Sequence, residues 1–298
     1  MLCSFFKKSK QAYYKQLKLA EINVLKDDVM LGLVEEQRVV WKRGSGRNLH
    51  KSLEAKFAEH NLKIGRDKFF DFLREHKLLI RPKRFRTKTT CSYAHLNKFD
   101  YLIKDKIPTR KNEIWVSDIT YIWLRQKGKF CYLSLITDLY SRKIVGYCLH
   151  KDLSTEGCLE ALKMALSQRQ KSDRILTHHS DRGVQYCSHA YVELLTKNNI
   201  QISMTQTGDP LENAVAERIN KTIKEEFTTE RQMSFRSLKN AKETMDKIVE
   251  FYNTQRPHRS VEWMTPMQAH ETKGELKRHW KTYYKKRETE PANLAKND

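Results

Sequence analysis

Three carboxylates in this sequence lie where folding could bring them together. Asp118 lies within the apolar, strand-like run IWVSDITYI, Asp181 follows the apolar run RILTHHS, and Glu217 lies in the helix-like stretch LENAVAERINK. A charge at a buried strand end is costly unless something pairs with it. If the strands that carry the two aspartates are neighbours, a helix packed on the sheet can add Glu217. Carboxylates that meet in this way repel one another and need compensating cations.

Hard divalent cations are the natural partners of such oxygen ligands, so the cofactor that we expect is magnesium, with manganese as a substitute. Two ions held ~3.5–4 Å apart can activate a nucleophile and stabilise a leaving oxygen in phosphoryl transfer. Periodicity alone does not select these three carboxylates over their rivals, which are Asp138, Asp209, Glu212, Glu225 and Glu226.

Alternating strands and helices between residues 112 and 205 must position the aspartates. Runs rich in β-branched and aromatic residues predict strands, and amphipathic runs predict helices. The segments follow one another in the order β-β-β-α-β-α-β: 113–124, 130–140, 142–150, 154–170, 174–181, 189–199 and 200–204. Three hairpin-like strands followed by alternating elements predict a mixed α/β sheet that is covered by helices.

The N-terminal part of the chain is predicted to be helical. Its apolar spacing predicts a helix at 27–43 and two shorter amphipathic helices at 48–60 and 66–79, which are joined by the turn NLKIG. Two helices joined in this way resemble a helix-turn-helix. A helical bundle without DNA contacts explains the pattern equally well. On the C-terminal side, helices are predicted at 211–227, 237–253 and 264–270, with Thr265 as the N-cap of the last one.

The formal net charge of +21 predicts a polyanionic partner, nucleic acid first, although a generic basic protein has the same charge. Residues 1–110 hold 26 Lys and Arg against 12 Asp and Glu, a net of +14. The stretch IRPKRFRTK contributes Arg81, Lys83, Arg84 and Arg86 with no acidic residue. It is typical of a basic segment that lies on phosphates, with a solvated linker as the alternative.

Other classes of protein fit poorly. No apolar run approaches the length of a membrane span, and the N-terminal apolar patch is too short for a signal peptide. The six cysteines are scattered without a CxxC pair, which argues against a structural zinc site and a disulfide scaffold. We therefore expect a soluble cytoplasmic protein with reduced thiols.

Five motifs in order carry a resemblance to a known family. WVSDITYI, TDLYSRKIVGY, HHSDRGVQY, ENAVAE and YNTQRPHRS resemble the integrase-core transposases of bacterial insertion sequences, the DDE enzymes related to retroviral integrases. The closest likeness is to the second reading frame of the insertion-sequence-three family, over roughly residues 40–270. Asp181 and Glu217 have 35 residues between them, the family's spacing, whereas Glu212 stands where the family commonly has Asp.

The resemblance implies a ribonuclease-H-like fold and an acidic triad of Asp118, Asp181 and Glu217, which is also the ligand set for two magnesium ions. It implies a helix-turn-helix-like DNA-binding region at 1–90, a basic linker at 91–111, an integrase catalytic core at 112–228, and C-terminal helices with a flexible tail at 229–298. The expected activity is cutting and joining of insertion-element ends. A ribonuclease-H-type nuclease that does not join, and a non-catalytic DNA-binding regulator, are the alternatives.

The expected partners are double-stranded DNA at element ends and at targets, further copies of this chain, and the product of an upstream reading frame. The expected location is the nucleoid of a bacterial cytoplasm. For DNA contact within the core we propose Lys221 and Lys224, which follow Glu217 by one and two helical turns. His179 is expected to contact phosphate or hold the loop, and Asn213 to orient Glu217 or a phosphate. For both residues a loop-stabilising role is as expected as direct contact. Structural roles are expected for Arg256, His258 and Asp138.

Overall fold

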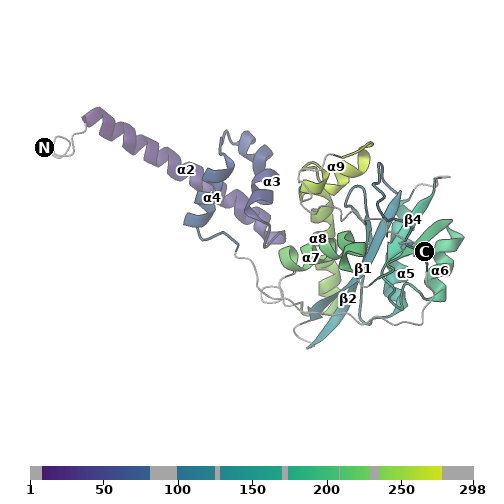
Figure 1. Ribbon diagram of the computed structural model, residues 1–298. Coiled ribbons are helices and arrows are strands. Elements are labelled where there is room, and N and C mark those ends of the chain that lie inside the picture. Colours follow the sequence, from purple (N-terminus) through teal and green to yellow (C-terminus); the bar gives the residue numbers. More distant parts are fainter. Residues whose placement is uncertain are drawn as a thin grey trace, which may run out of the picture.

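The computed structural model describes residues 9–80, 99–124, 128–169, 174–207, 209–228 and 235–276. Figure 1 shows a long helix, α2 (Lys10–Val40), that projects from a group of shorter helices, which lies beside a sheet flanked by further helices. Residues 81–98 lie outside the described part of the chain, and with them the predicted DNA contacts Arg81, Lys83, Arg84 and Arg86.

Within the described residues the sheet has five strands, in the spatial order β3-β2-β1-β4-β5. The strands are β1 (Ile114–Leu124), β2 (Lys129–Asp138), β3 (Ile144–His150), β4 (Leu176–Ser180) and β5 (Ile200–Met204). The first three strands pair antiparallel, while β4 lies parallel to both β1 and β5. The prediction of a mixed, ribonuclease-H-like sheet is therefore confirmed. The two aspartate-bearing strands are adjacent, which is the condition on which convergence of the aspartates depended.

Helices cover both faces of the sheet. On one face, α5 (Thr155–Gln168) and α6 (His189–Lys197) pack on the side chains of Trp115 and Ile136. On the other face lie α7 (Ala214–Thr222) and α8 (Leu238–Thr254), which contact Ile122 and Leu124. Successive side chains of a strand point to opposite faces, so even-numbered residues of β1 face α7. Asp118 belongs to that set.

The segment predicted as one helix at 211–227 is a continuous helix of three successive types. It begins as a short 3-10 turn, η2 (Pro210–Asn213), continues as α7, and ends as the π-helical segment η3 (Ile223–Phe227). The backbone N–H of Thr228 donates to the carbonyl of Ile223 at 3.1 Å, the i to i+5 bond of a π-helix. After α8 come η4 (Arg259–Val261) and α9 (Pro266–Glu271), where Thr265 forms the predicted N-cap within a full capping box.

The N-terminal helices share a hydrophobic core with the sheet. α3 (Gly46–Glu59) and α4 (Arg66–Glu75) form the predicted helix pair, in which Gly65 caps α4 and Asn61 takes the left-handed conformation, with φ of 55°. Trp41, which follows α2 directly, is fully buried against Phe227 and Phe251, with ring centroids 6.3 Å and 5.6 Å away. The predicted domain boundaries and DNA reading by the helix pair stay predictions.

Candidate active site

The register of two parallel strands brings Asp118 and Asp181 to the same edge of the sheet. Val116 of β1 is paired with His179 of β4, and each aspartate lies two residues further along its strand direction. The side chain two residues on returns to the same face. The sequence left this convergence conditional on neighbouring strands, and the pairing of β1 with β4 meets that condition.

Two asparagines fix α7 over this edge. The Asn213 side-chain amide donates to the Ser117 carbonyl at 2.9 Å, and that of Asn220 donates to Asp118 Oδ2 at 2.8 Å. They are seven residues apart, and Glu217 lies between them on the same helix face, four residues after one and three before the other. Glu217 is therefore turned toward the two aspartates.

Each of the three carboxyl groups has a raised pKa. For Asp118 the pKa rises to about 7, mainly through desolvation and then through the charge of Asp181, against opposing hydrogen bonds from Asn220 and the Ile119 N–H. Desolvation raises the pKa of Asp181, although the Gly183 N–H donates to its Oδ1 at 3.0 Å. Desolvation and the charge of Asp181 raise the pKa of Glu217. The carboxylates thus repel one another without a compensating cation.

The donor chemistry of this edge fits a hard divalent cation, because three mutually repelling carboxylates supply only oxygen ligands. The fit is incomplete in geometry: across the described residues, no three His, Cys, Asp or Glu side chains are grouped closely enough to hold one ion. Asp118 is half-buried, whereas Asp181 and Glu217 are exposed at the open edge. Hydrogen bonds hold the carboxylates of Asp118 and Asp181 in place, whereas the Glu217 side chain extends from the exposed surface of α7.

His179 and Asn213 are both buried, which favours a role in holding the loops over contact with phosphate. The His179 ring lies within 2.9 Å of Ser203 Oγ and 3.1 Å of the Glu212 carbonyl, one partner for each ring nitrogen. Burial lowers the pKa of His179 to about 4, so the ring is neutral. Both side chains hold the site's scaffold, and phosphate contact has no support in their placement.

The two lysines after Glu217 differ in exposure. Lys221 is exposed on α7 and lies 3.9 Å from Glu225, whereas Lys224 is half-buried at the start of the π-helical segment. Contact of both lysines with DNA stays a prediction.

Two rival carboxylates have structural roles. Asp138 is buried and accepts hydrogen bonds from the backbone of Asn112 and Ser141 and from the Ser141 hydroxyl, so the expected structural role is confirmed. Glu226 accepts two hydrogen bonds from Arg256, at 2.8 Å and 2.7 Å, and one from the Trp41 indole at 2.6 Å. This confirms a structural role for Arg256.

Sequence reasoning missed Asn220 and the partnership of Glu226 with Trp41. Asn220 lies on a helix whose sequence pattern does not distinguish a buried polar residue from a solvent-exposed one. Trp41 and Glu226 are 185 residues apart, beyond the reach of any local periodicity. One signal was available, because a Trp at the end of an apolar helix face usually needs a partner for its N–H when buried.

Comparison with known proteins places the chain in a family. Two models of the integrase core domain match residues 108–210 and 198–266. The insertion element IS600 uncharacterized 31 kDa protein of Shigella sonnei is 31% identical over 270 residues, which cover 89% of this chain and 96% of the relative. The chain belongs to the insertion-sequence transposases of the integrase-core superfamily. The resemblance read from the five motifs is thereby confirmed.

Other members of this transposase family match over shorter stretches. The transposase for IS629 of Shigella sonnei is 35% identical over 142 residues, 48% of this chain and 46% of the relative, so the chain aligns with about half of that protein. Among solved structures, the HTLV-2 integrase catalytic core domain in complex with magnesium matches with a TM-score of 0.39 and 19% identity, over 54% of this chain and 97% of that one. The HTLV-2 domain is described with magnesium in both a trimeric and a dimeric form.

Every helix in the described part of the chain is too short or too polar to span a membrane.

Proposed function

We propose that this chain cuts and joins DNA at the ends of an insertion element, with Asp118, Asp181 and Glu217 as its catalytic residues. One observation supports this most strongly: within the stretch that the two integrase-core models match, β1, β4 and α7 direct three carboxylates toward one edge of the sheet. These carboxylates repel one another, and a bound cation would relieve that repulsion.

Asp118 and Asp181 would hold the cation, and Glu217 would complete the ligand set from α7. A divalent cation bound there supplies a Lewis acid that lowers the pKa of a bound water and stabilises charge on phosphate oxygens. Two magnesium ions, with manganese as a substitute, are the form of the cofactor that we propose.

Neighbouring groups orient the ligands. The Asn220 amide fixes Asp118 Oδ2, and the Ile119 N–H fixes Oδ1 at 2.9 Å, so the carboxylate has one orientation before any cation arrives. The Gly183 N–H holds Asp181 in the same way. A Cβ at Gly183 would lie 3.1 Å from Asp181 Oδ1, so a larger residue would press on the ligand. These are positioning residues, because they act through the carboxylates.

We propose as substrates the terminal repeats of the element and a double-stranded target, with further copies of this chain and the product of an upstream frame as partners. The basic character of the chain supports the first part of this proposal, since its net charge is +21. A joining assay distinguishes a transposase from a nuclease that only hydrolyses.

The test uses D118N, D181N and E217Q, which keep the shape of each side chain and remove one anionic ligand. Magnesium-dependent nicking and joining of a labelled element end should fall to background in all three, while DNA binding is retained and the melting temperature in magnesium-free buffer does not fall. Calcium should support binding and poorly support chemistry, because its coordination is looser.

The matched control is E225Q, on the exposed continuation of the same helical path, which should keep most of the activity. Asp138 is unsuitable as a control, since its buried carboxylate accepts hydrogen bonds from three donors. Full activity in E217Q, or loss of activity in E225Q alone, would assign the third carboxylate elsewhere.

A further inference from the structure

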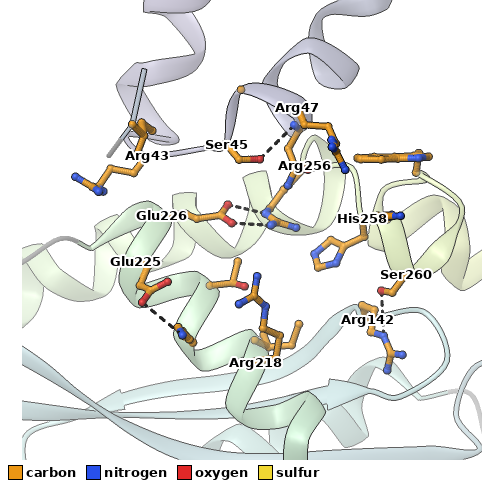
Figure 2. A pocket seen from close by; sticks show the side chains of 18 of the residues that line it. Arg43, Ser45, Arg47, Arg142, Arg218, Glu225, Glu226, Arg256, His258 and Ser260 are labelled. Atoms are coloured by element: carbon orange, nitrogen blue, oxygen red, sulfur yellow. Dashed lines mark hydrogen bonds and ion pairs between the residues drawn. The ribbon is translucent and has the colours of Figure 1, made fainter. Parts of the chain in front are cut away.

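A large basic cleft lies between the N-terminal helices and the catalytic core. Its volume is about 1000 Å³, and its walls come from the first turn of α3, one face of α7 with the π-helical segment, and the segment around η4. Seven cationic side chains line it against two acidic ones. The cations are Arg43, Arg47, Arg142, Arg218, Lys221, Arg256 and Arg259, and the acids are Glu225 and Glu226. Figure 2 shows most of these side chains around the cleft.

The acidic residues offset only part of this charge. The Glu226 carboxylate is engaged by Arg256 and Trp41, and Glu225 lies 3.9 Å from Lys221. Arg47, Arg218 and Arg259 are exposed, so their guanidinium groups are accessible to a ligand. The cleft is therefore a concentrated positive surface in contact with solvent, which favours a polyanion.

Two polar features point to an acceptor-rich ligand. The ring of His258 lines the cleft, is only 8% exposed, and has no hydrogen-bond partner for its Nε2. The first turn of α3 also lines it, with Gly46, Arg47 and Asn48, and the N-terminus of a helix attracts phosphate. Burial and the charges of Arg256, Arg142 and Arg218 hold the pKa of His258 well below its usual range. A neutral His258 can donate one hydrogen bond to a phosphate oxygen.

The helix α7 connects the cleft to the carboxylates. Four of its cleft-lining residues recur at steps of three or four and so share one helix face, which Glu225 continues in the π-helical segment: Ala214, Arg218, Lys221 and Thr222. Glu217, the residue before Arg218, lies on the adjacent face toward Asp118 and Asp181. A strand that leaves the carboxylates can therefore cross α7 and enter the cleft.

We propose that this cleft binds the sugar–phosphate backbone of the DNA that flanks the reacting phosphodiester, gripping it with Arg47 from the N-terminal helices and Arg218 and Arg259 from the core. The proposal rests on the function proposed above. DNA is favoured over a small anion because the cations are spread over three elements around a space far larger than one phosphate. The apolar surfaces of Phe70, Val215 and Trp263 beside them suit sugars and bases.

The test measures binding of the full chain to a short DNA duplex by fluorescence anisotropy in EDTA, where no cleavage occurs. R47Q, R218Q and R259Q should each weaken binding about 3–10-fold, and the triple variant about 100-fold or more, because each removes a phosphate contact. Each lost contact should also reduce the slope of log K against log salt by about 0.9. The melting temperature of each variant is measured to show that it folds.

The control is K163Q, which removes one positive charge from the exposed side of α5 on the opposite face of the sheet. It should keep the wild-type affinity and salt slope. Wild-type binding by the triple variant would overturn the proposal. So would a triple variant that binds DNA normally and loses affinity for poly-L-glutamate, since the cleft would then take an acidic protein segment.

A second measurement separates this proposal from the assignment of the carboxylates. Phenylglyoxal modification, followed by mass spectrometry, should show that DNA protects Arg47, Arg218 and Arg259 in wild type and in E217Q alike. Protection together with wild-type cleavage by D118N, D181N and E217Q would support the cleft and contradict the proposed catalytic residues. Cleavage without protection of these arginines would support the catalytic residues and contradict the cleft.

Discussion

At the scale of single residues, the fold holds the carboxylates of the candidate site close together and partly away from water, which costs free energy when they are ionised. Asp118 belongs to the half-buried part of a central strand, and the first cause of its raised pKa is desolvation. Its position was predictable, because an acidic residue between apolar neighbours on a strand demands a partner. The partner Asn220 was not, because a polar residue on a helix carries no mark of what it faces.

The pKa of Asp118 predicts a pH-dependent stability difference between wild type and D118N in metal-free buffer. The folded pKa of about 7 exceeds the unfolded value of 3.8, so the folded state holds the extra proton between them. Wild-type stability therefore falls as pH rises from about 4 to about 7, whereas the amide side chain of the D118N variant does not titrate. D118N should be equal in stability near pH 4 and more stable by about 2–4 kcal/mol above pH 7.

Urea unfolding at several pH values, with EDTA present, measures this difference. Magnesium should shrink or reverse it, because the cation stabilises the ionised wild-type site. A difference that stays constant from pH 4 to pH 8 would mean that Asp118 does not titrate in this range.

At the scale of elements, the sequence predicted the strands and the helices, because periodicity reports local geometry. The adjacency of β1 and β4 was only a condition, because the pairing of distant strands leaves no local pattern. The sequence did not predict the π-helical segment Ile223–Phe227, because helix-like spacing continues through it. That segment turns Glu226 toward Trp41 and Arg256, so the helix bearing Glu217 is fixed at its far end by the N-terminal region. The contacts of Glu226 with Trp41 and Arg256 stabilise this π-helical turn, and they are tertiary contacts that no local pattern reports.

Breaking this buried ion pair should destabilise the fold strongly. E226Q leaves the buried guanidinium of Arg256 without its countercharge, which should cost about 3–5 kcal/mol of unfolding free energy. E225Q is the matched control: its partner lies 3.9 Å away on an exposed surface, so the expected cost is below about 1 kcal/mol. Urea unfolding monitored by circular dichroism measures both. Equal stabilities of the two variants would show that the Glu226 pair does not hold the segment.

At the scale of the whole molecule, the N-terminal helices and the catalytic core form one hydrophobic unit. Leu49, Leu53 and Phe69 belong to the same buried cluster as Leu133 and Tyr252, with Trp41 between the two parts. The cleft lies at this junction, so its two walls keep a fixed relation only while the shared core is intact. Charge counts along the chain suggested a separable basic region at residues 1–110, but they carry no information on which apolar faces meet.

Two deletions test this unity and should differ sharply. The first part of α2 projects from the molecule in Figure 1 and exposes Tyr14, Val24 and Leu25, so removal of residues 1–26 should change the unfolding free energy by less than about 1 kcal/mol. Removal of residues 1–110 takes away Trp41 and uncovers Phe227 and Phe251. The unfolding free energy lost should exceed the about 3–5 kcal/mol that a single buried Trp-to-Ala change costs. That chain should show no cooperative urea transition by circular dichroism. Near-wild-type stability after the longer deletion would show that the core folds without the N-terminal helices, and DNA affinity could then be assigned to each part separately.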